Sequence, residues 1–244
     1  SILSVSSMNH PVDFHEGEVI LVDKPLKITS FGAVNRIKRV FVQRTKKKRY
    51  KIGHAGTLDP LASGLLIMCS GTKTKTISSF QNLPKEYTAT IRLGATTPSY
   101  DLETEIDQTF DISSLTEEKI RECAQSFVGE QGPLPPIFSA KKIQGKRAYD
   151  LARAGEEVNV TPNKIIIHEM EVLSVNLPDV KVRIACSKGT YIRSIAYDFG
   201  VKLNNGGHLT ELRRTKIGSY DVENAHTIEQ VQQWIFDSEF TPIS

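Results

Sequence analysis

A short run of residues around one carboxylate, GHAGTLDP at positions 53–60, has the residue types best suited to chemistry. Its two glycines let the backbone approach another molecule closely, and Pro60 restricts Asp59 to an extended or turn conformation. Six of the eight residues in the preceding stretch 44–51 are basic. A lone acid at the end of a cationic approach indicates chemistry on a polyanion, although glycines and an Asp-Pro pair are also typical of an ordinary turn.

Five segments, in the same order along the chain, resemble the bacterial tRNA pseudouridine-55 synthases of the TruB type. They are GHAGTLDPLASG at 53–64, KEY at 85–87, FSAKK with QGK at 138–146, CSKGTYIR at 186–193 and LRR at 212–214. The resemblance runs from about residue 17 to about residue 231. It implies an enzyme that breaks the bond between uracil N1 and ribose C1′, rotates the base and rejoins it through C5. Such a reaction involves no redox step, so we expect no cofactor and no metal.

The resemblance assigns catalytic roles to Asp59, Tyr87 and Arg193. Asp59 corresponds to the key carboxylate; it could attack the base, attack the sugar or remove a sugar proton. Arg193 would pair with it, because a guanidinium binds a carboxylate through two hydrogen bonds, and Tyr87 would stack on the target base. Taken alone, Arg193 could equally be a surface helix residue and Tyr87 a core strand residue.

The same resemblance assigns further residues to RNA or to supporting the site. His54 would fill the space left when the target nucleotide leaves its stack, Leu212 would pack against the base, and Tyr191 would support Asp59 or Arg193. His54 could instead be a hydrogen-bonded loop residue and Leu212 plain core. The remaining RNA contacts are expected from Asp101, Lys188, Lys141, Lys142, Lys146 and Arg147. Asp101 is equally well explained as one more acid in an acidic loop.

The distribution of charge says more than its total, since the net charge is only +3. Basic residues gather at 44–51, 141–147 and 213–216, and acidic residues gather at 101–122. This segregation predicts a nucleic-acid-binding face opposite an acidic one. Three widely spaced cysteines indicate neither a zinc site nor a disulfide framework. With no signal peptide and no apolar run long enough to span a bilayer, we expect a cytoplasmic protein.

The pattern of apolar residues predicts an α+β fold, because strands come in hairpins and helices are interspersed irregularly. Strands are expected at 18–22, 65–69, 86–93, 165–177 and 180–187. Helices are expected to begin at Ser30, Thr72, Thr116, Tyr191 and Thr227, with Gln230 completing a capping box at the last. The resemblance adds a mixed, mainly antiparallel bent sheet flanked by helices.

The expected organisation is a flexible N-terminus (1–16) and one catalytic domain (17–244) carrying an inserted RNA-binding lobe at about 130–162. The chain ends about where many relatives begin a small C-terminal RNA-binding domain of the PUA type. We expect a monomer that acts on the tRNA T-stem-loop without a guide RNA or an obligatory protein partner. Two rivals stay open: a non-catalytic RNA-binding or RNA-folding protein, and a synthase for ribosomal or messenger RNA.

Overall fold

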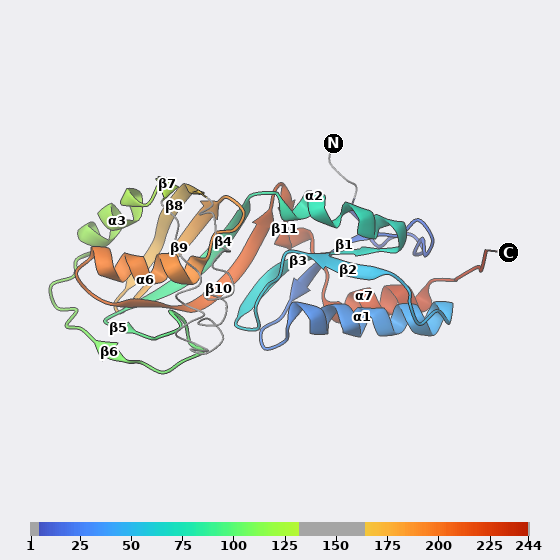
Figure 1. Ribbon diagram of the computed structural model, residues 1–244, viewed down its shortest axis with the longest axis horizontal. Coiled ribbons are helices and arrows are strands. Elements are labelled where there is room, and N and C mark those ends of the chain that lie inside the picture. Colours follow the sequence, from blue (N-terminus) through green and yellow to red (C-terminus); the bar gives the residue numbers. More distant parts are fainter. Residues whose placement is uncertain (1–4, 132–163, 244) are drawn as a thin grey trace, which may run out of the picture. The chain divides into compact units, whose positions relative to one another are not determined.

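The computed structural model describes residues 5–131 and 164–243. It confirms the α+β prediction: a mainly antiparallel sheet is flanked by helices (Figure 1). The chain divides into two compact units, Ser1–Leu83 with Arg213–Ser244, and Pro84–Leu212. We describe each unit separately and call them unit 1 and unit 2.

Unit 1 holds the N-terminal and C-terminal elements. They are β1 (Val19–Lys24), α1 (Ser30–Thr45), β2 (Ile52–Ala55), β3 (Ala62–Ser70), the 3₁₀ helix η1 (Gly71–Thr76), α2 (Ile77–Gln81), the end of β10 (Gly207–Ile217), β11 (Tyr220–Asp221), the 3₁₀ helix η2 (Val222–Asn224) and α7 (Ile228–Asp237). The strand order is β1-β3-β10, while β2 also pairs with β3 and β11 with β10. Helices α1 and α7 lie side by side (Figure 1), and their apolar faces share a core with residues of β1 and β3.

Unit 2 holds the central elements. They are β4 (Lys85–Leu93), β5 (Ala95–Thr96), β6 (Gln108–Thr109), α3 (Glu117–Ser126), β7 (Gly129–Gln131), β8 (Ile165–Asn176), β9 (Asp179–Cys186), α6 (Ile192–Lys202) and the start of β10. The strand order is β10-β4-β9-β8-β7. In β4, Tyr87, Ala89, Ile91 and Leu93 are buried and alternate with less buried residues, as a strand with one face on a core requires.

Helix starts show where local sequence is a good guide. Thr116 caps α3 by accepting from Lys119 N, and Thr227 with Gln230 forms the expected capping box of α7. The prediction was wrong at Ser30: Thr29 is the N-cap of α1, accepting from Gly32 N. It was also wrong at Thr72, which lies inside η1 and donates to the carbonyl of Glu16.

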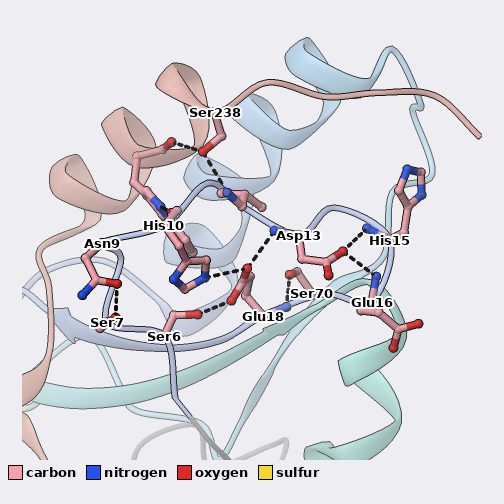
Figure 2. A network of polar contacts seen from close by, with 12 residues as sticks. Ser6, Ser7, Asn9, His10, Asp13, His15, Glu16, Glu18, Ser70 and Ser238 are labelled. Carbon is pink, nitrogen blue, oxygen red and sulfur yellow. Dashed lines mark hydrogen bonds and ion pairs between the residues drawn. The ribbon is translucent and has the colours of Figure 1, made fainter.

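The N-terminal segment is described from residue 5 and joins unit 1 through a polar network (Figure 2). The buried Glu18 carboxylate accepts from Ser6 Oγ and from Asp13 N and contacts His10 Nε2, while Glu18 N donates to Ser70 Oγ. Flexibility of residues 1–16 and the predicted domain boundaries stay predictions. The three cysteines are buried and unpaired, and no helix among the described residues is long and apolar enough to cross a membrane.

Candidate active site

Asp59 lies in unit 1, in the loop between β2 and β3, and its side chain is exposed. Leu58, the residue before it, has both its backbone N–H and its backbone carbonyl hydrogen-bonded to the side chain of Ser30. Ser30 Oγ accepts from Leu58 N at 2.7 Å and donates to Leu58 O at 2.9 Å, and both residues are buried. After it, Ala62 N donates to Asp59 O at 2.9 Å. The carboxylate is therefore presented to solvent on a backbone held by hydrogen bonds on either side of Asp59.

Arg214 supports the same loop from below. Its guanidinium is buried and donates to three carbonyls: Leu65 O at 2.9 Å, Gly56 O at 3.0 Å and Thr57 O at 3.4 Å. The cluster of basic residues at 213–216 predicted a basic surface, and this was wrong for Arg214, which is 2% exposed. The Arg213 side chain is 39% exposed and is paired with Asp23 at 2.9 Å. These arginines organise backbone and carboxylate groups of the protein itself.

A third cation beneath the loop is Lys24, which is 0% exposed at the end of β1. Its ammonium donates to Pro25 O at 2.7 Å and Ile28 O at 2.9 Å. Burial lowers the pKa of Lys24 to about 8, attraction to the Asp59 carboxylate opposes that shift, and repulsion from Arg214 adds to it. Asp59 thus stands in the field of a buried ammonium within its own unit.

His54 comes from β2, opposite Met68 of β3. Burial, and then the charge of Arg214, lower the pKa of His54, so its imidazole is neutral at pH 7. Among the described residues no hydrogen-bond partner reaches its buried Nδ1. A neutral, half-buried ring suits a residue that stacks in place of a base better than one that carries charge.

Tyr87 and Leu212 lie in unit 2, at the start of β4 and in β10. Tyr87 is 9% exposed and stands opposite Ile184 of β9. Leu212 is partly buried against the same hydrophobic core. Both residues therefore pack in or against the hydrophobic core, which is the alternative that the sequence left open for them.

Arg193 and Tyr191 stand at the start of α6 in unit 2. The guanidinium carbon of Arg193 lies 5.5 Å from the centroid of the Tyr191 ring, a cation–π contact that orients the guanidinium. Lys188 is exposed in the loop that leads to α6. Asp59 belongs to unit 1 and Arg193 to unit 2, so their pairing stays a prediction.

Asp101 has a structural environment in unit 2. It is 9% exposed, and its carboxylate accepts from Ser99 Oγ at 2.6 Å and from Glu103 N at 2.9 Å. These hydrogen bonds stabilise the loop that contains Asp101, as expected if Asp101 is an acid of that loop with a structural role. Lys141, Lys142, Lys146 and Arg147 lie outside the described residues. Within the described part of the chain, no three His, Cys, Asp or Glu side chains form a group that could hold a metal ion.

Three supporting residues, Ser30, Lys24 and Arg214, were missed as parts of the site. The sequence predicted a different role for Ser30, because a serine before an apolar helix is typical of an N-cap. Lys24 and Arg214 carried charge, and a charged residue is rarely buried unless it is paired. The sequence shows that Lys24 lies in a KP segment and Arg214 in an LRR segment, but it does not show that either side chain is buried.

Comparison with known proteins supports the resemblance over nearly the whole chain. Residues 39–192 match the TruB family pseudouridylate synthase N-terminal domain, and residues 193–242 match the tRNA pseudouridylate synthase B C-terminal domain. A protein named tRNA pseudouridine synthase B from Flavobacterium johnsoniae is 56% identical over 88% of this chain and 94% of its own length. One of the same name from Phocaeicola vulgatus is 50% identical over 95% of this chain and 99% of its own length.

Solved structures agree on the fold. A chain in the crystal structure of the archaeal box H/ACA sRNP Nop10-Cbf5 complex matches 94% of this chain with a TM-score of 0.66 and 26% identity. This chain spans 57% of the length of that one. With matches to both domains and relatives at half identity or more, the chain belongs to the TruB family of pseudouridylate synthases.

Proposed function

We propose that this protein isomerises uridine to pseudouridine at position 55, in the T-loop of tRNA, with Asp59 as the key catalytic carboxylate. The relatives that share half or more of its sequence are named for a tRNA pseudouridine synthase. The single observation that carries the role of Asp59 is its loop: an exposed carboxylate on a backbone fixed by Ser30 and Arg214.

The reaction needs a positioned carboxylate more than any imported group. The N1–C1′ bond breaks, the uracil turns, the C5–C1′ bond forms, and the hydrogen at C5 leaves as a proton while N1 gains one. Atoms and electrons balance without an oxidant. A target base in a folded loop must leave its stack before this can happen, and we assign the vacated space to His54.

In unit 2, Tyr87 is proposed to stack on the flipped base, with Leu212 packing against it. A tyrosine supplies a flat apolar face with a polar tip, which suits a pocket wall that contacts a uracil. Arg193, oriented by Tyr191, would bind the carboxylate of Asp59 through two hydrogen bonds of its guanidinium. We also propose that Lys188 and the lysines of the 130–162 segment contact tRNA phosphates, as the charge pattern of the sequence predicts.

We further propose that the protein acts as a cytoplasmic monomer without a guide RNA. The Cbf5 chain to which it is similar belongs to a box H/ACA sRNP, so turnover by the purified protein alone is the decisive observation for this point. Addition of a cell extract that restores a missing activity would contradict it.

The test is tritium release from a tRNA T-stem-loop whose uridine carries the label at C5. Isomerisation leaves the mass unchanged but displaces that hydrogen. We expect release by the wild type, none by Asp59→Asn, and wild-type release by Asp237→Asn, a matched change at an exposed aspartate at the end of α7. RNA binding without release by the wild type would favour the RNA-binding rival, and release from ribosomal or messenger RNA alone would favour the other.

A further inference from the structure

The loop that joins α1 to β2 is a strongly cationic surface of unit 1. We call residues 46–51 the basic loop; five of its six residues are basic and exposed, namely Lys46, Lys47, Lys48, Arg49 and Lys51. No carboxylate forms an ion pair with any of these five within the described residues. Their charges are therefore not neutralised by the part of the protein that the structure describes.

The basic loop is held in a defined conformation by its one non-basic residue. Tyr50 is buried, stacks on Phe41 with ring centroids 4.6 Å apart, and donates its hydroxyl to Phe14 O at 2.6 Å. Lys46 adopts a left-handed conformation, and its N–H closes α1 on Val42 O. Because the backbone of the basic loop is already ordered, a partner that binds its side chains does not have to pay the entropy cost of ordering that backbone.

Two more lysines lie next to the basic loop. Gly71 N donates to Lys51 O at 2.9 Å, which joins the loop to η1, and η1 carries Lys73 and Lys75. Three acids border the same region: Glu16, whose carbonyl accepts from Thr72, and Asp13 and Glu18, whose carboxylates act on Tyr50. The local balance is still strongly positive, which is the electrostatic footprint of a surface that binds a polyanion.

Helix α1 sets the distance between the basic loop and Asp59. Its first residue, Ser30, is hydrogen-bonded to Leu58, the neighbour of Asp59, and its last residue, Thr45, precedes the basic loop. A rise of 1.5 Å per residue from 30 to 45 gives about 22 Å. Double-stranded DNA rises ~3.4 Å per base step along a strand, and the A-form helix of RNA rises less, so this distance corresponds to at least about six base steps.

We propose that the basic loop is a second tRNA contact, which binds the phosphate backbone about 22 Å from the uridine at Asp59. This inference rests on the proposed function, since it takes the tRNA to be seated with its target uridine at Asp59. The contact reads no sequence; it adds affinity and orients the rest of the tRNA relative to the T-loop. It belongs to a longer RNA, because a minimal stem-loop of fewer than six base steps does not reach it.

The test compares two substrates and two variants. The test variant is Lys48→Gln/Arg49→Gln/Lys51→Gln, none of whose side chains makes a hydrogen bond or ion pair with the described residues. The control Lys119→Gln/Lys164→Gln/Lys181→Gln removes the same charge from exposed sites of unit 2. Kd is measured for full-length tRNA and for a minimal T-stem-loop between 50 and 200 mM salt.

For full-length tRNA we expect the test variant to lose about three phosphate contacts. The negative slope of log K against log salt should then become shallower by about 2.7. Such contacts are worth about 40-fold in affinity across a fourfold change of salt, so Kd at low salt should rise at least about tenfold. For the minimal stem-loop, Kd and tritium release should stay within about twofold of wild type.

An unchanged Kd and salt slope for full-length tRNA would overturn the inference, and so would an equal loss with both substrates or an equal effect of the control. Failure of the proposed function looks different: the wild type would release no tritium from either RNA. The two results are separated by the wild-type stem-loop assay alone.

Discussion

Removing one hydroxyl, in Ser30→Ala, should reduce catalysis without unfolding the protein. The Ser30 Oγ makes both hydrogen bonds to the Leu58 peptide groups, at 2.7 and 2.9 Å, and Leu58 is 3% exposed. Its loss leaves a buried N–H and a buried carbonyl without that partner, which costs about 1–3 kcal/mol of the free energy of unfolding. Once the loop relaxes, a shift of about 1 Å at Asp59 lowers the rate about 100-fold.

The neighbouring Thr29 provides a matched control. Its hydroxyl caps α1 by accepting from Gly32 N at 2.8 Å, so Thr29→Ala also costs about 1 kcal/mol. It has no hydrogen bond to the Asp59 loop among the described residues. The assays are urea unfolding and steady-state tritium release from the T-stem-loop.

We expect Ser30→Ala to lower kcat about 10- to 100-fold with KM nearly unchanged, and Thr29→Ala to keep kcat. A wild-type kcat in Ser30→Ala would refute the positioning argument. Equal losses of kcat in both variants would refute it as well, because they would trace the effect to helix stability.

Two further predictions concern Lys24 and Gly64. Because the folded pKa of Lys24 is about 8 against an ordinary 10.5, the unfolded chain binds more protons between these values, and stability rises with pH there. Urea unfolding should show the wild type gaining up to about 3 kcal/mol relative to Lys24→Met between pH 8 and 10.5; a pH-independent difference would contradict the buried ammonium. A Cβ on Gly64, at φ +112°, would lie 2.2 Å from Arg214 O, whereas one on Gly129, at φ +115°, meets nothing within 4 Å. Gly64→Ala should therefore cost more than the 1–3 kcal/mol of backbone strain that Gly129→Ala isolates, and equal unfolding midpoints would argue against the clash.

Features set by neighbouring residues could be predicted from the sequence. The alternation in β4 and the capping box at Thr227 depend on side chains two to four positions apart, and periodicity reports such relations directly. Features set by distant partners could not. Ser30 has the right type and place for an N-cap, but Leu58, 28 residues away, takes its hydroxyl and leaves the cap to Thr29.

The candidate site divides in the same way. Asp59 and His54 belong to a motif that can be recognised from its residue types, whereas Lys24 and Arg214 are buried cations that support the loop. Charge in a sequence predicts exposure, and only the positions of the Gly56, Thr57 and Leu65 carbonyls explain why Arg214 is buried. The basic loop, whose charges are exposed, follows the ordinary rule.

The most direct test of the role of Asp59 is single-turnover tritium release with enzyme in excess over a C5-labelled T-stem-loop. Excess enzyme makes the signal independent of product release, and a parallel binding measurement confirms that each variant holds the RNA. We predict complete release by the wild type and none by Asp59→Asn at equal RNA occupancy. Release by Asp59→Asn at the wild-type rate would contradict the assignment of Asp59 as the catalytic carboxylate.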